Sequence, residues 1–350
     1  MSVLRMCIFL FCGLVISAQD KNLYQIHTIA FYNAENLFDT LKDSLVFDDA
    51  FTPEGSFHWT QERYKKKIEN LAKVISGIGE RYRMRPPDVI GLCEVENLKV
   101  LQDLVAHPVL RNFNYGIIHQ DGPDERGIDV AMLFNKRTFL PVAIKQHSLQ
   151  LLNEQRFREY TRNQLVVYGF LDNEAFYLIV NHWPSRRGGE TRSRPHRIAA
   201  AELNLSIIDS IEQIAFAPRI IGMGDFNDNP TDYSFIKVLR TKGKSKDLKD
   251  QELFNPMEQL FLKGEGSLAY RDRWSLFDQF YVSGNLRNGN APMQVWKAGI
   301  YNPPFLKIQQ GPYKGYPLRT YAGGRYTGGY SDHFPVYMYL IKQQSLLGNN

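Results

Sequence analysis

Cysteine is scarce in this sequence, and its placement excludes a fold held together by disulfides. The 350 residues contain three cysteines, Cys7, Cys12 and Cys93. The first two lie in an N-terminal segment that we expect to be removed, so the mature chain keeps Cys93 alone and can form no internal disulfide. Stability must therefore come from a hydrophobic core. A chain of this length with 43% hydrophobic residues can build one.

The sequence also lacks a hydrophobic run long enough to serve as a permanent membrane span. The apolar run Met6–Ser17 is too short for that purpose. Arg5 places a positive charge in front of it, and Ala18 followed by Gln19 offers a cleavage point. This pattern is typical of a secretory signal peptide, which we predict at residues 1–18. We therefore expect an exported protein, periplasmic or extracellular, without a stable membrane anchor. A buried N-terminal strand is the alternative, and the flanking residues disfavour it.

Residues 19–350 show no internal repeat, no linker and no sign of a second domain, so we predict a single large domain and a monomer. The net charge of +5 is mildly basic, which permits a polyanionic partner without requiring one. Strand-like apolar stretches alternate with segments of helical spacing, and hairpin signals are mixed with helical crossovers. This mixture indicates an α/β fold with mixed sheets.

The expected elements follow from hydrophobic periodicity and turn signals. Helices are predicted near residues 61–78, 98–106 and 197–211, the last with Ile198, Ala201, Leu205 and Ile208 on its buried face. Strands are predicted at 26–32, 88–93, 115–119, 129–134, 141–146, 164–171, 175–181, 219–223, 279–282 and 334–341. Asp172-Asn173 has the composition of a hairpin turn.

The stretch from Ile220 to Pro230 is the most informative part of the chain. Its apolar start has the character of a buried strand, which ends at Gly224. Asp225 and Asn227 follow, two residues apart, so on an extended chain they point to the same side. A carboxylate beside an amide suits a water, a metal ion or a phosphate oxygen. By itself such a pair more often belongs to a turn than to a functional site. Other polar residues in the chain must therefore show which of the two applies here.

Such residues exist, because polar side chains recur at the ends of the other predicted strands, directly after the earlier ones and directly before the last two. They are Asn33 and Glu35, then Glu94, His182, Asp278, and the pair Asp332 and His333. Each residue alone has a plain reading as a cap, a turn or a core histidine. If the strand ends meet at one rim, however, the rim holds several carboxylates, two amides and two imidazoles. Oxygen-rich ligand sets favour Mg²⁺, Mn²⁺ or Ca²⁺ over zinc. Such a set could also orient water and stabilise the charge that develops on a phosphodiester under attack.

At this point the chain resembles the endonuclease/exonuclease/phosphatase superfamily, the deoxyribonuclease I-like fold. Six motifs occur in the family order: Phe-Tyr-Asn-Ala-Glu-Asn (31–36), Gly-Leu-Cys-Glu-Val (91–95), Asn-His-Trp-Pro-Ser-Arg (181–186), Gly-Asp-Phe-Asn (224–227), Phe-Asp-Gln-Phe (277–280) and Ser-Asp-His-Phe-Pro-Val (331–336). Further segments, among them Thr-Pro-Glu-Gly-Ser (52–56), resemble the secreted bacterial nuclease branch. The resemblance implies a four-layer α/β sandwich of two packed mixed sheets flanked by helices.

The resemblance also implies a role for each residue. Glu94 would hold the divalent metal, Mg²⁺ or Mn²⁺ and conceivably Ca²⁺, with Asn33, Glu35 and Asp332 in its network. Asp225 would orient or deprotonate the attacking water, and Asn227 would fix a phosphate oxygen. His333, held by Asp278, would stabilise the developing charge. His182 resembles the histidine proposed as the acid for the leaving oxygen. Abasic-site relatives carry Asn there, so His182 disfavours an abasic-site repair enzyme.

Two further assignments rest on weaker signals. Arg162 lies in a segment similar to one whose arginine touches substrate phosphate, although Gln164 stands where relatives often have proline. Arg187 lies in a basic loop with Arg186 and Arg197, and we expect these arginines to line a groove for a phosphate backbone. Asp129, at a strand start, is a candidate for orienting His182.

The sequence therefore favours a secreted, metal-dependent phosphodiesterase, with a nuclease acting on DNA, and conceivably RNA, as the leading interpretation. A sphingomyelinase or an inositol-phosphate phosphatase on the same fold stays open, because the metal and water chemistry would be shared. A sphingomyelinase should expose an apolar loop for the membrane. A non-catalytic binding module is the alternative of another class, and the presence of Glu94, Asp225 and His333 speaks against it.

Overall fold

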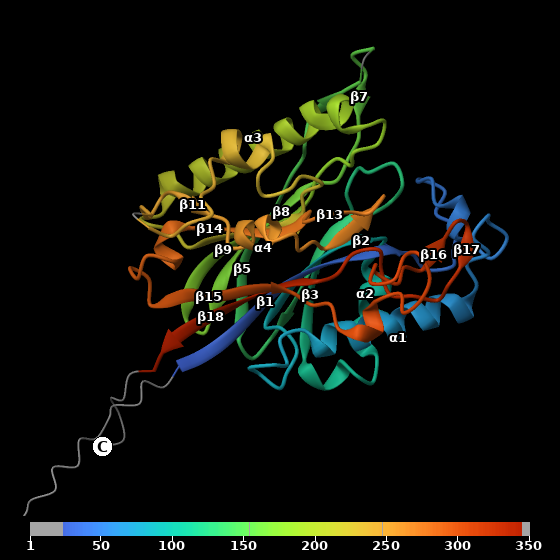
Figure 1. Cartoon of the computed structure of the whole chain (residues 1–350), viewed down its shortest axis with the longest axis horizontal. Coiled ribbons are helices and arrows are strands. Elements are labelled where there is room, and N and C mark those ends of the chain that lie inside the picture. Colours follow the sequence, from blue (N-terminus) through green and yellow to red (C-terminus); the bar gives the residue numbers. More distant parts are fainter. Residues whose placement is uncertain (1–23, 154, 247, 345–350) are drawn as a thin grey trace, which may run out of the picture.

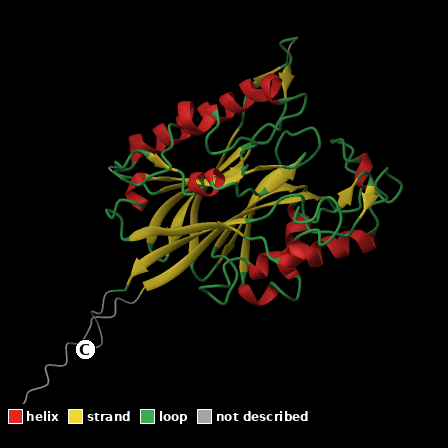
Figure 2. Cartoon of the chain, in the orientation of Figure 1, coloured by secondary structure: helices red, strands yellow, loops and turns green. Residues whose placement is uncertain are grey.

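Two mixed β-sheets packed face to face form the centre of the molecule, and helices cover their outer faces (Figures 1 and 2). The computed structural model describes residues 24–153, 155–246 and 248–344. The predicted signal peptide lies outside these residues. Among the helices they contain, none combines the length and apolar character needed to cross a membrane.

The first sheet has six strands in the order β15-β18-β1-β2-β4-β3. Their bounds are β1 Tyr24–Leu37, β2 Val89–Val95, β3 Tyr115–His119, β4 Asp129–Asn135, β15 Met293–Ile300 and β18 Val336–Gln343. Strands β1 and β2 run parallel, and the other neighbours are antiparallel.

The second sheet also has six strands, in the order β11-β14-β10-β9-β8-β5. Their bounds are β5 Phe139–His147, β8 Gln164–Leu171, β9 Glu174–His182, β10 Ile220–Asp225, β11 Leu253–Phe254 and β14 Asp278–Ser283. Here β9 and β10 form the parallel pair. Each sheet thus has one parallel pair near its middle, which needs a long crossover, and hairpins elsewhere.

Side-chain alternation along the strands builds four layers. Phe31 of β1 points into the space between the sheets and shares a core with Val180 and Met223 of the second sheet. Tyr32, the next residue, points outwards and packs with helices α1 (Gln61–Gly77) and α2 (Leu98–Ala106). On the far side, Ile179 faces helix α3 (Glu190–Ile214). The structure therefore confirms the predicted four-layer sandwich, because each sheet is apolar on both faces and must be covered twice.

The remaining elements are short and lie in the connections. The short helix is α4 Glu258–Leu262, and a π-helical segment is η3 Ser234–Leu239. Three two-stranded sheets are formed by β6 Leu151–Leu152 with β7 Arg158–Glu159, by β12 Leu268–Tyr270 with β13 Arg273–Ser275, and by β16 Tyr321–Ala322 with β17 Arg325–Tyr326. The single turns are η1 Asp49–Phe51, η2 Arg111–Phe113, η4 Gly284–Leu286 and η5 Pro304–Leu306. The β16–β17 hairpin lies beside the first sheet and contributes to the site described below.

Helix α3 departs from the prediction in its start and in its buried face. It begins at Glu190, ahead of the predicted start near residue 197, and contains Pro195, although proline removes a helical hydrogen bond. Its buried face includes Arg197 and Asn204, while Ile198 and Leu205 are only partly buried. The two polar side chains are buried because they have partners inside the protein. Arg197 pairs with Asp228 at 2.6 Å, and the Asn204 amide donates to the Asn181 side chain at 2.7 Å.

Strand β15 is the long element that the sequence did not reveal. It pairs with β18, and its register shifts between Val295 and Lys297. This bulge breaks the alternation of apolar and polar residues that identifies a strand.

Candidate active site

The predicted residues meet at one edge of the sandwich because of strand direction. Parallel strands β1 and β2 end at this edge, as do β9 and β10 in the other sheet, while antiparallel β14 begins there. In the second sheet Asp225 lies opposite both His182 and Asp278 in register. Residues more than a hundred positions apart in sequence are thereby brought into one cluster, as expected where strand ends face a ligand.

The backbone bends sharply where the strands meet the site. Glu94 has φ 57°, Asn227 has φ 51°, and Glu35 and Asn36 have φ 49° and 56°. A non-glycine residue in the left-handed region is uncommon and costs free energy, so such residues concentrate where function requires a particular side-chain direction. Four of them at one edge mark it as the functional site.

Asn33 links the two sheets through its amide. Its Nδ2 donates to Glu94 Oε1 at 3.4 Å and to Asp225 Oδ2 at 3.1 Å, while its Oδ1 accepts the backbone N–H of Glu35 at 2.8 Å. Because the backbone donor fixes Oδ1, the amide N–H₂ must face the two carboxylates. Asn33 therefore positions Glu94 and Asp225 in this arrangement, and its own oxygen is not directed at the metal position we had predicted for it.

Asp225 sits at the centre of the cluster. Burial raises the pKa of its carboxyl to about 7, and Asp278 and Glu94 add to this while the charge of His333 opposes it. Its Oδ1 accepts the backbone N–H of Asn227 at 3.0 Å, which fixes the carboxylate against the turn that follows β10. A buried carboxylate with other carboxylates close by is a characteristic of catalytic sites.

His333 and Asp278 form the strongest polar contact of the site. Asp278 is completely buried, and its Oδ2 lies 2.6 Å from His333 Nδ1. Burial disfavours the charged ring, yet Asp278 and Asp225 outweigh it and raise the pKa of His333 well above its ordinary value. The ring then presents Nε2 to the site, 3.9 Å from Asp225 and 4.0 Å from Asp332. The predicted pair is present, with a carboxylate that holds a cationic imidazole in place.

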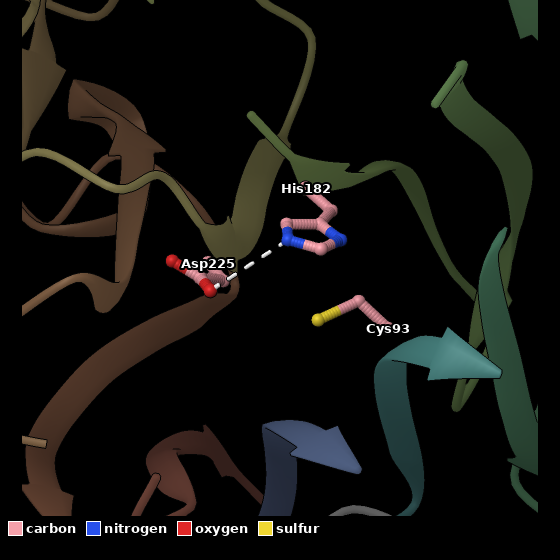
Figure 3. A group of neighbouring side chains, drawn as sticks. All are labelled: Cys93, His182 and Asp225. Carbon is pink, nitrogen blue, oxygen red and sulfur yellow. Dashed lines mark ion pairs between the residues drawn. The ribbon is translucent and has the colours of Figure 1, made fainter. Parts of the chain in front are cut away.

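His182 lies on the other side of Asp225 (Figure 3). Its Nε2 is 3.8 Å from Asp225 Oδ2 and 3.9 Å from Glu94 Oε1. Burial, followed by the charges of Arg162 and Arg126, lowers the pKa of His182 well below its ordinary value. Cys93 completes this small cluster from β2. Burial, with Asp225 and Glu94 nearby, raises the pKa of its thiol, so Cys93 stays protonated and acts as a packing residue, as the sequence suggested.

Asn227 and Asp332 occupy the rim. The Asn227 amide donates to the backbone oxygen of Trp183 at 3.0 Å, which orients it beside the His182 strand. Asp332 is partly exposed, and its Oδ2 accepts from Arg319 at 2.7 Å. Asn227 thus lies beside the His182 strand, and Asp332 lies 4.0 Å from Nε2 of His333.

A hard divalent cation fits the carboxylates of this cluster. Glu94 keeps free lone pairs, because its oxygens accept only the amide of Asn33 and the backbone N–H of Asn36, at 3.4 and 3.0 Å, and its side chain is 16% exposed. Asp225 and Asp278 lie close behind, and the mutual repulsion that raises the pKa of Asp225 is what a cation would relieve. All available donors are oxygens or imidazole nitrogens apart from the protonated thiol, which agrees with Mg²⁺ or Mn²⁺.

Glu35 is not placed as the sequence predicted. Its carboxylate accepts the Thr320 backbone N–H at 2.6 Å and lies 3.3 Å from Arg319 and 3.8 Å from the buried Lys67. These partners use both oxygens. Glu35 therefore anchors the loop before β16 to strand β1, and the structure does not support it as a metal ligand.

The predicted arginine groove needs a larger correction. Arg197 is completely buried and pairs with Asp228, and Arg186 is held by Asp228 and by Asp232. Arg162 is 6% exposed and donates to Asp124 and to the Trp183 backbone oxygen. These three guanidinium groups are buried or largely covered, so they organise loops and present little surface to a phosphate. Arg187 is exposed and stays a candidate for substrate contact.

Asp129 does not orient His182. Its Oδ2 lies 3.3 Å from Nε2 of His119, the residue on the neighbouring strand β3. Within the described part of the chain, Nδ1 of His182 has no hydrogen-bond partner. The strand register decides this pairing, because Asp129 faces the β3 side of the sheet.

Arg319 is the site residue that the sequence did not single out. It lies in the loop before β16, bridges Glu35 and Asp332, and keeps its side chain 47% exposed. Neighbouring carboxylates outweigh desolvation and raise the pKa of its guanidinium, so it is a permanent cation at the rim beside His333. No local motif marks it, because its partners lie far apart in the sequence. Glu35 belongs to β1, near the start of the chain, and Asp332 lies just before β18, near its end.

Comparison with known proteins agrees with this geometry. The sequence matches the profile of the Endonuclease/Exonuclease/phosphatase family over residues 28–342. The chain belongs to this family. Members of the endonuclease/exonuclease/phosphatase family are phosphoric-ester hydrolases, and dependence on a divalent metal is typical of them. The cluster of Glu94, Asp225 and His333 is accordingly the candidate active site of this hydrolase.

Solved structures share the family fold. An endonuclease/exonuclease/phosphatase family protein from Bacteroides thetaiotaomicron has a TM-score of 0.54 at 15% identity, covering 92% of this chain and 100% of its own. D. rerio TDP2 in complex with a single-strand DNA product has a TM-score of 0.52 at 15% identity, covering 90% and 98%. A mannosyl-6-phosphatase from Bacteroides thetaiotaomicron has 0.52 at 16% identity, covering 90% and 99%. No curated protein matches the chain significantly. Such identities establish the fold and leave the substrate open.

Proposed function

We propose that this protein is a secreted, divalent-metal-dependent nuclease that hydrolyses phosphodiester bonds in DNA. The observation that carries the reaction is the position of His333. Its ring is fixed by Asp278 at 2.6 Å and directs Nε2 to within 3.9 Å of Asp225. The imidazolium of His333 can stabilise the negative charge that develops on a phosphate, and the carboxylate of Asp225 can orient the attacking water. The two groups are close enough to act on the same phosphate.

Each residue has a step that its position permits. A Mg²⁺ or Mn²⁺ ion held by Glu94 would polarise the phosphate and neutralise its charge. Asp225 orients the attacking water and accepts its proton, and Asn227 steadies a non-bridging oxygen. His333 stabilises the charge that develops on the phosphate through its Nε2–H. His182 faces the same space from β9 and, as a neutral ring, donates a hydrogen bond from its Nε2–H that stabilises the leaving oxygen, which takes its proton from water; the lowered pKa does not support the proton-donating role that the resemblance implied.

A nucleic acid as substrate is supported by the cations at the rim and by one of the neighbours. Arg187 is exposed after β9, and Arg319 is half-exposed beside Asp332. The solved D. rerio TDP2 carries a single-strand DNA product. Export rests on the predicted signal peptide at residues 1–18.

A lipid phosphodiesterase is the second candidate, and a specific observation favours it. Leu41, Leu45 and Phe47, in the loop after β1, are 73%, 88% and 73% exposed. A membrane-acting enzyme such as a sphingomyelinase needs an apolar loop of this kind near its site. The same loop carries Asp43, however, and Asp48 and Asp49 follow it, so its charge opposes an anionic surface. A phosphatase for sugar or inositol phosphates would use the same catalytic residues.

A substrate panel separates these candidates. Purified protein is assayed on plasmid and single-stranded DNA, RNA, sphingomyelin, inositol phosphates and a sugar phosphate, with Mg²⁺ and with chelator. The nuclease proposal expects rapid metal-dependent cleavage of DNA. Rapid hydrolysis of sphingomyelin or a phosphomonoester without DNA cleavage would reject it and leave the hydrolase assignment intact.

The salt dependence of DNA binding gives an independent measurement on an Asp225→Asn variant. Each phosphate neutralised on duplex DNA contributes about −0.9 to the slope of log K against log salt. Arg187→Ala should weaken binding on all sequences alike and flatten the slope by about one unit. Arg111→Ala is the matched control, because η2 precedes β3 at the end of the strand remote from the site. Equal slopes for both variants and the parent would remove Arg187 from the binding surface.

A further inference from the structure

An aromatic pocket opens beside the catalytic cluster. It has a volume of about 260 Å³, and its walls come from the segment around η1 and from the β16–β17 hairpin. The side chains that matter for its chemistry are Phe51, Phe57, Trp59, Arg319 and Tyr321. This volume accommodates one ring system and is too small for a duplex.

The walls of the pocket hold one another in place. The Phe57 ring lies 5.0 Å from that of Phe51 and 4.6 Å from that of Tyr321, and Phe38 stacks behind Phe51 at 4.3 Å. The Tyr321 hydroxyl donates to the backbone oxygen of Phe57 at 2.8 Å. Trp59 is completely buried and donates its indole N–H to the backbone at 3.0 Å. A cavity whose rings are already fixed loses little conformational entropy when a ligand enters.

The pocket is directly connected to the catalytic residues. Asn36 lines it, and its backbone N–H donates to the proposed metal ligand Glu94 at 3.0 Å. Arg319 lines it from the other side and donates to Asp332 at 2.7 Å, next to His333. A group attached to a phosphate beside His333, next to a cation that Glu94 would hold, therefore has the pocket as its neighbour, with Arg319 at the entrance.

Two polar side chains of the pocket wall, those of Glu35 and Thr320, are already occupied. Glu35 lines the pocket, but Thr320 and Arg319 use its carboxylate. The Thr320 hydroxyl accepts from Lys67 at 2.6 Å. A pyranose or inositol ring, which needs many hydrogen-bond partners, would find few here. A planar ring with an apolar face finds aromatic surfaces on which to stack.

We propose that this pocket binds one unstacked nucleobase of the nucleotide next to the scissile phosphate, with Arg319 contacting the phosphate at its entrance. The proposal rests on the nuclease function and deepens it, because it makes a single strand or a strand end the preferred substrate. A base inside a duplex would have to leave its stack to enter, which costs free energy.

The test compares intact and abasic substrates. Short single strands are made with one hydrolysable phosphodiester each. In the intact strand both nucleotides that flank this bond carry a base. In two abasic strands a tetrahydrofuran replaces the nucleotide's sugar and base, on the 5′ side in one strand and on the 3′ side in the other. Removal of the base on one side should lower kcat/KM by roughly 5- to 150-fold, the range expected for one base stacked on aromatic rings. Phe57→Leu should lower activity on the intact strand and leave the abasic strand unchanged. Phe216→Leu is the matched control, since Phe216 is fully exposed ahead of β10, at the end opposite the site.

Binding provides a second readout that does not need turnover. On Asp225→Asn protein, calorimetry compares deoxythymidine 5′-phosphate with deoxyribose 5-phosphate. If the nucleotide binds more tightly than deoxyribose 5-phosphate, and if Phe57→Leu abolishes this difference, the result supports the pocket. This holds even if the protein does not cleave DNA and the nuclease proposal fails. Equal affinity for the two ligands, or equal kcat/KM on intact and abasic strands, would overturn the proposal. Tyr321→Leu replaces Phe57→Leu if thermal melting shows that the first variant is unfolded.

Discussion

Single residues in this site owe their chemistry to their neighbours. His333 is held at 2.6 Å by a carboxylate with no exposed surface, and its charged state follows from that contact. His182 has no such partner on its Nδ1 among the described residues, and burial lowers its pKa. Two histidines of one site are thereby driven to opposite charge states, which is how a protein separates an electrostatic stabiliser from a neutral donor.

Loss of a catalytic side chain should therefore affect turnover more than stability. We expect His333→Ala, Asp225→Ala and His182→Ala each to lower kcat by on the order of 10² or more, as for other transition-state stabilisers. Steady-state kinetics with Mg²⁺ measures this, and thermal melting confirms folding. Cys93→Ser, at a position whose thiol is protonated, is the control and should keep its activity. Near-normal turnover of a folded alanine variant would remove that residue from the mechanism.

At the scale of elements, strand β1 combines the site with a pH-sensitive contact at its other end. Asn33 lies near the end of β1, whereas His27 lies near its start and is completely buried. His27 is 3.5 Å from Asp88, which precedes β2, and 3.6 Å from Asp172, in the turn between β8 and β9. The ring thus joins the two sheets at the end opposite the catalytic cluster.

His27 should make the protein less stable in mild acid. Burial lowers its pKa from 6.5 to about 4, with Arg85 and Lys342 also opposing protonation and Asp172 favouring it. The unfolded chain binds a proton below pH 6.5 that the native ring accepts only near pH 4. The contribution of His27 to the free energy of unfolding is therefore complete above pH 6.5. It is lost as the pH drops towards 4, which lowers the free energy of unfolding by on the order of 3 kcal/mol.

Urea unfolding of the parent and of His27→Gln between pH 4 and 8 isolates this contribution. The difference between the two curves removes the contributions of other groups, among them Asp225 and Glu96, whose raised pKa values act in the opposite direction. We expect the difference to vary with pH only below about 6.5. A difference that is constant across this range would show that His27 does not titrate as described.

At the scale of the whole molecule, the sandwich places carboxylates from both sheets at one edge. Glu94 comes from the first sheet, and Asp225 and Asp278 come from the second. A divalent cation bound at this edge would relieve their mutual repulsion. The metal should therefore be required for activity and should also stabilise the folded protein, since binding to the native state alone adds stability.

Activity should disappear in EDTA and return with Mg²⁺ or Mn²⁺, with Ca²⁺ as a further ion to test. The melting temperature should rise with metal in the parent and rise less in Glu94→Gln. Asp209→Asn is the control, because Asp209 is an exposed carboxylate on the outer helix α3. Full activity in chelator would contradict the metal assignment.

The sequence alone determined the fold and most of the catalytic cluster, because these depend on local patterns. Alternating apolar residues located the strands, Asp172-Asn173 formed the predicted hairpin with φ 49° and 65°, and the polar residues at the strand ends marked the rim. The direction of the parallel strands placed Glu94 at an edge of the first sheet and Asp225 at an edge of the second, and the packing of the two sheets brought these edges together. Helix α2 and strands β3 and β8 have the predicted bounds.

Only the tertiary structure decided the partners of charged side chains. A basic residue reads the same in sequence whether it is exposed, as Arg187 is, or buried against Asp228, as Arg197 is. Asp129 binds His119 instead of His182 because of the register between β3 and β4. Arg319 joins the site because a loop nearly three hundred residues beyond Glu35 folds back onto it. Ion pairs act through space over a few ångströms, and the distances that select them exist only once the sheets have packed.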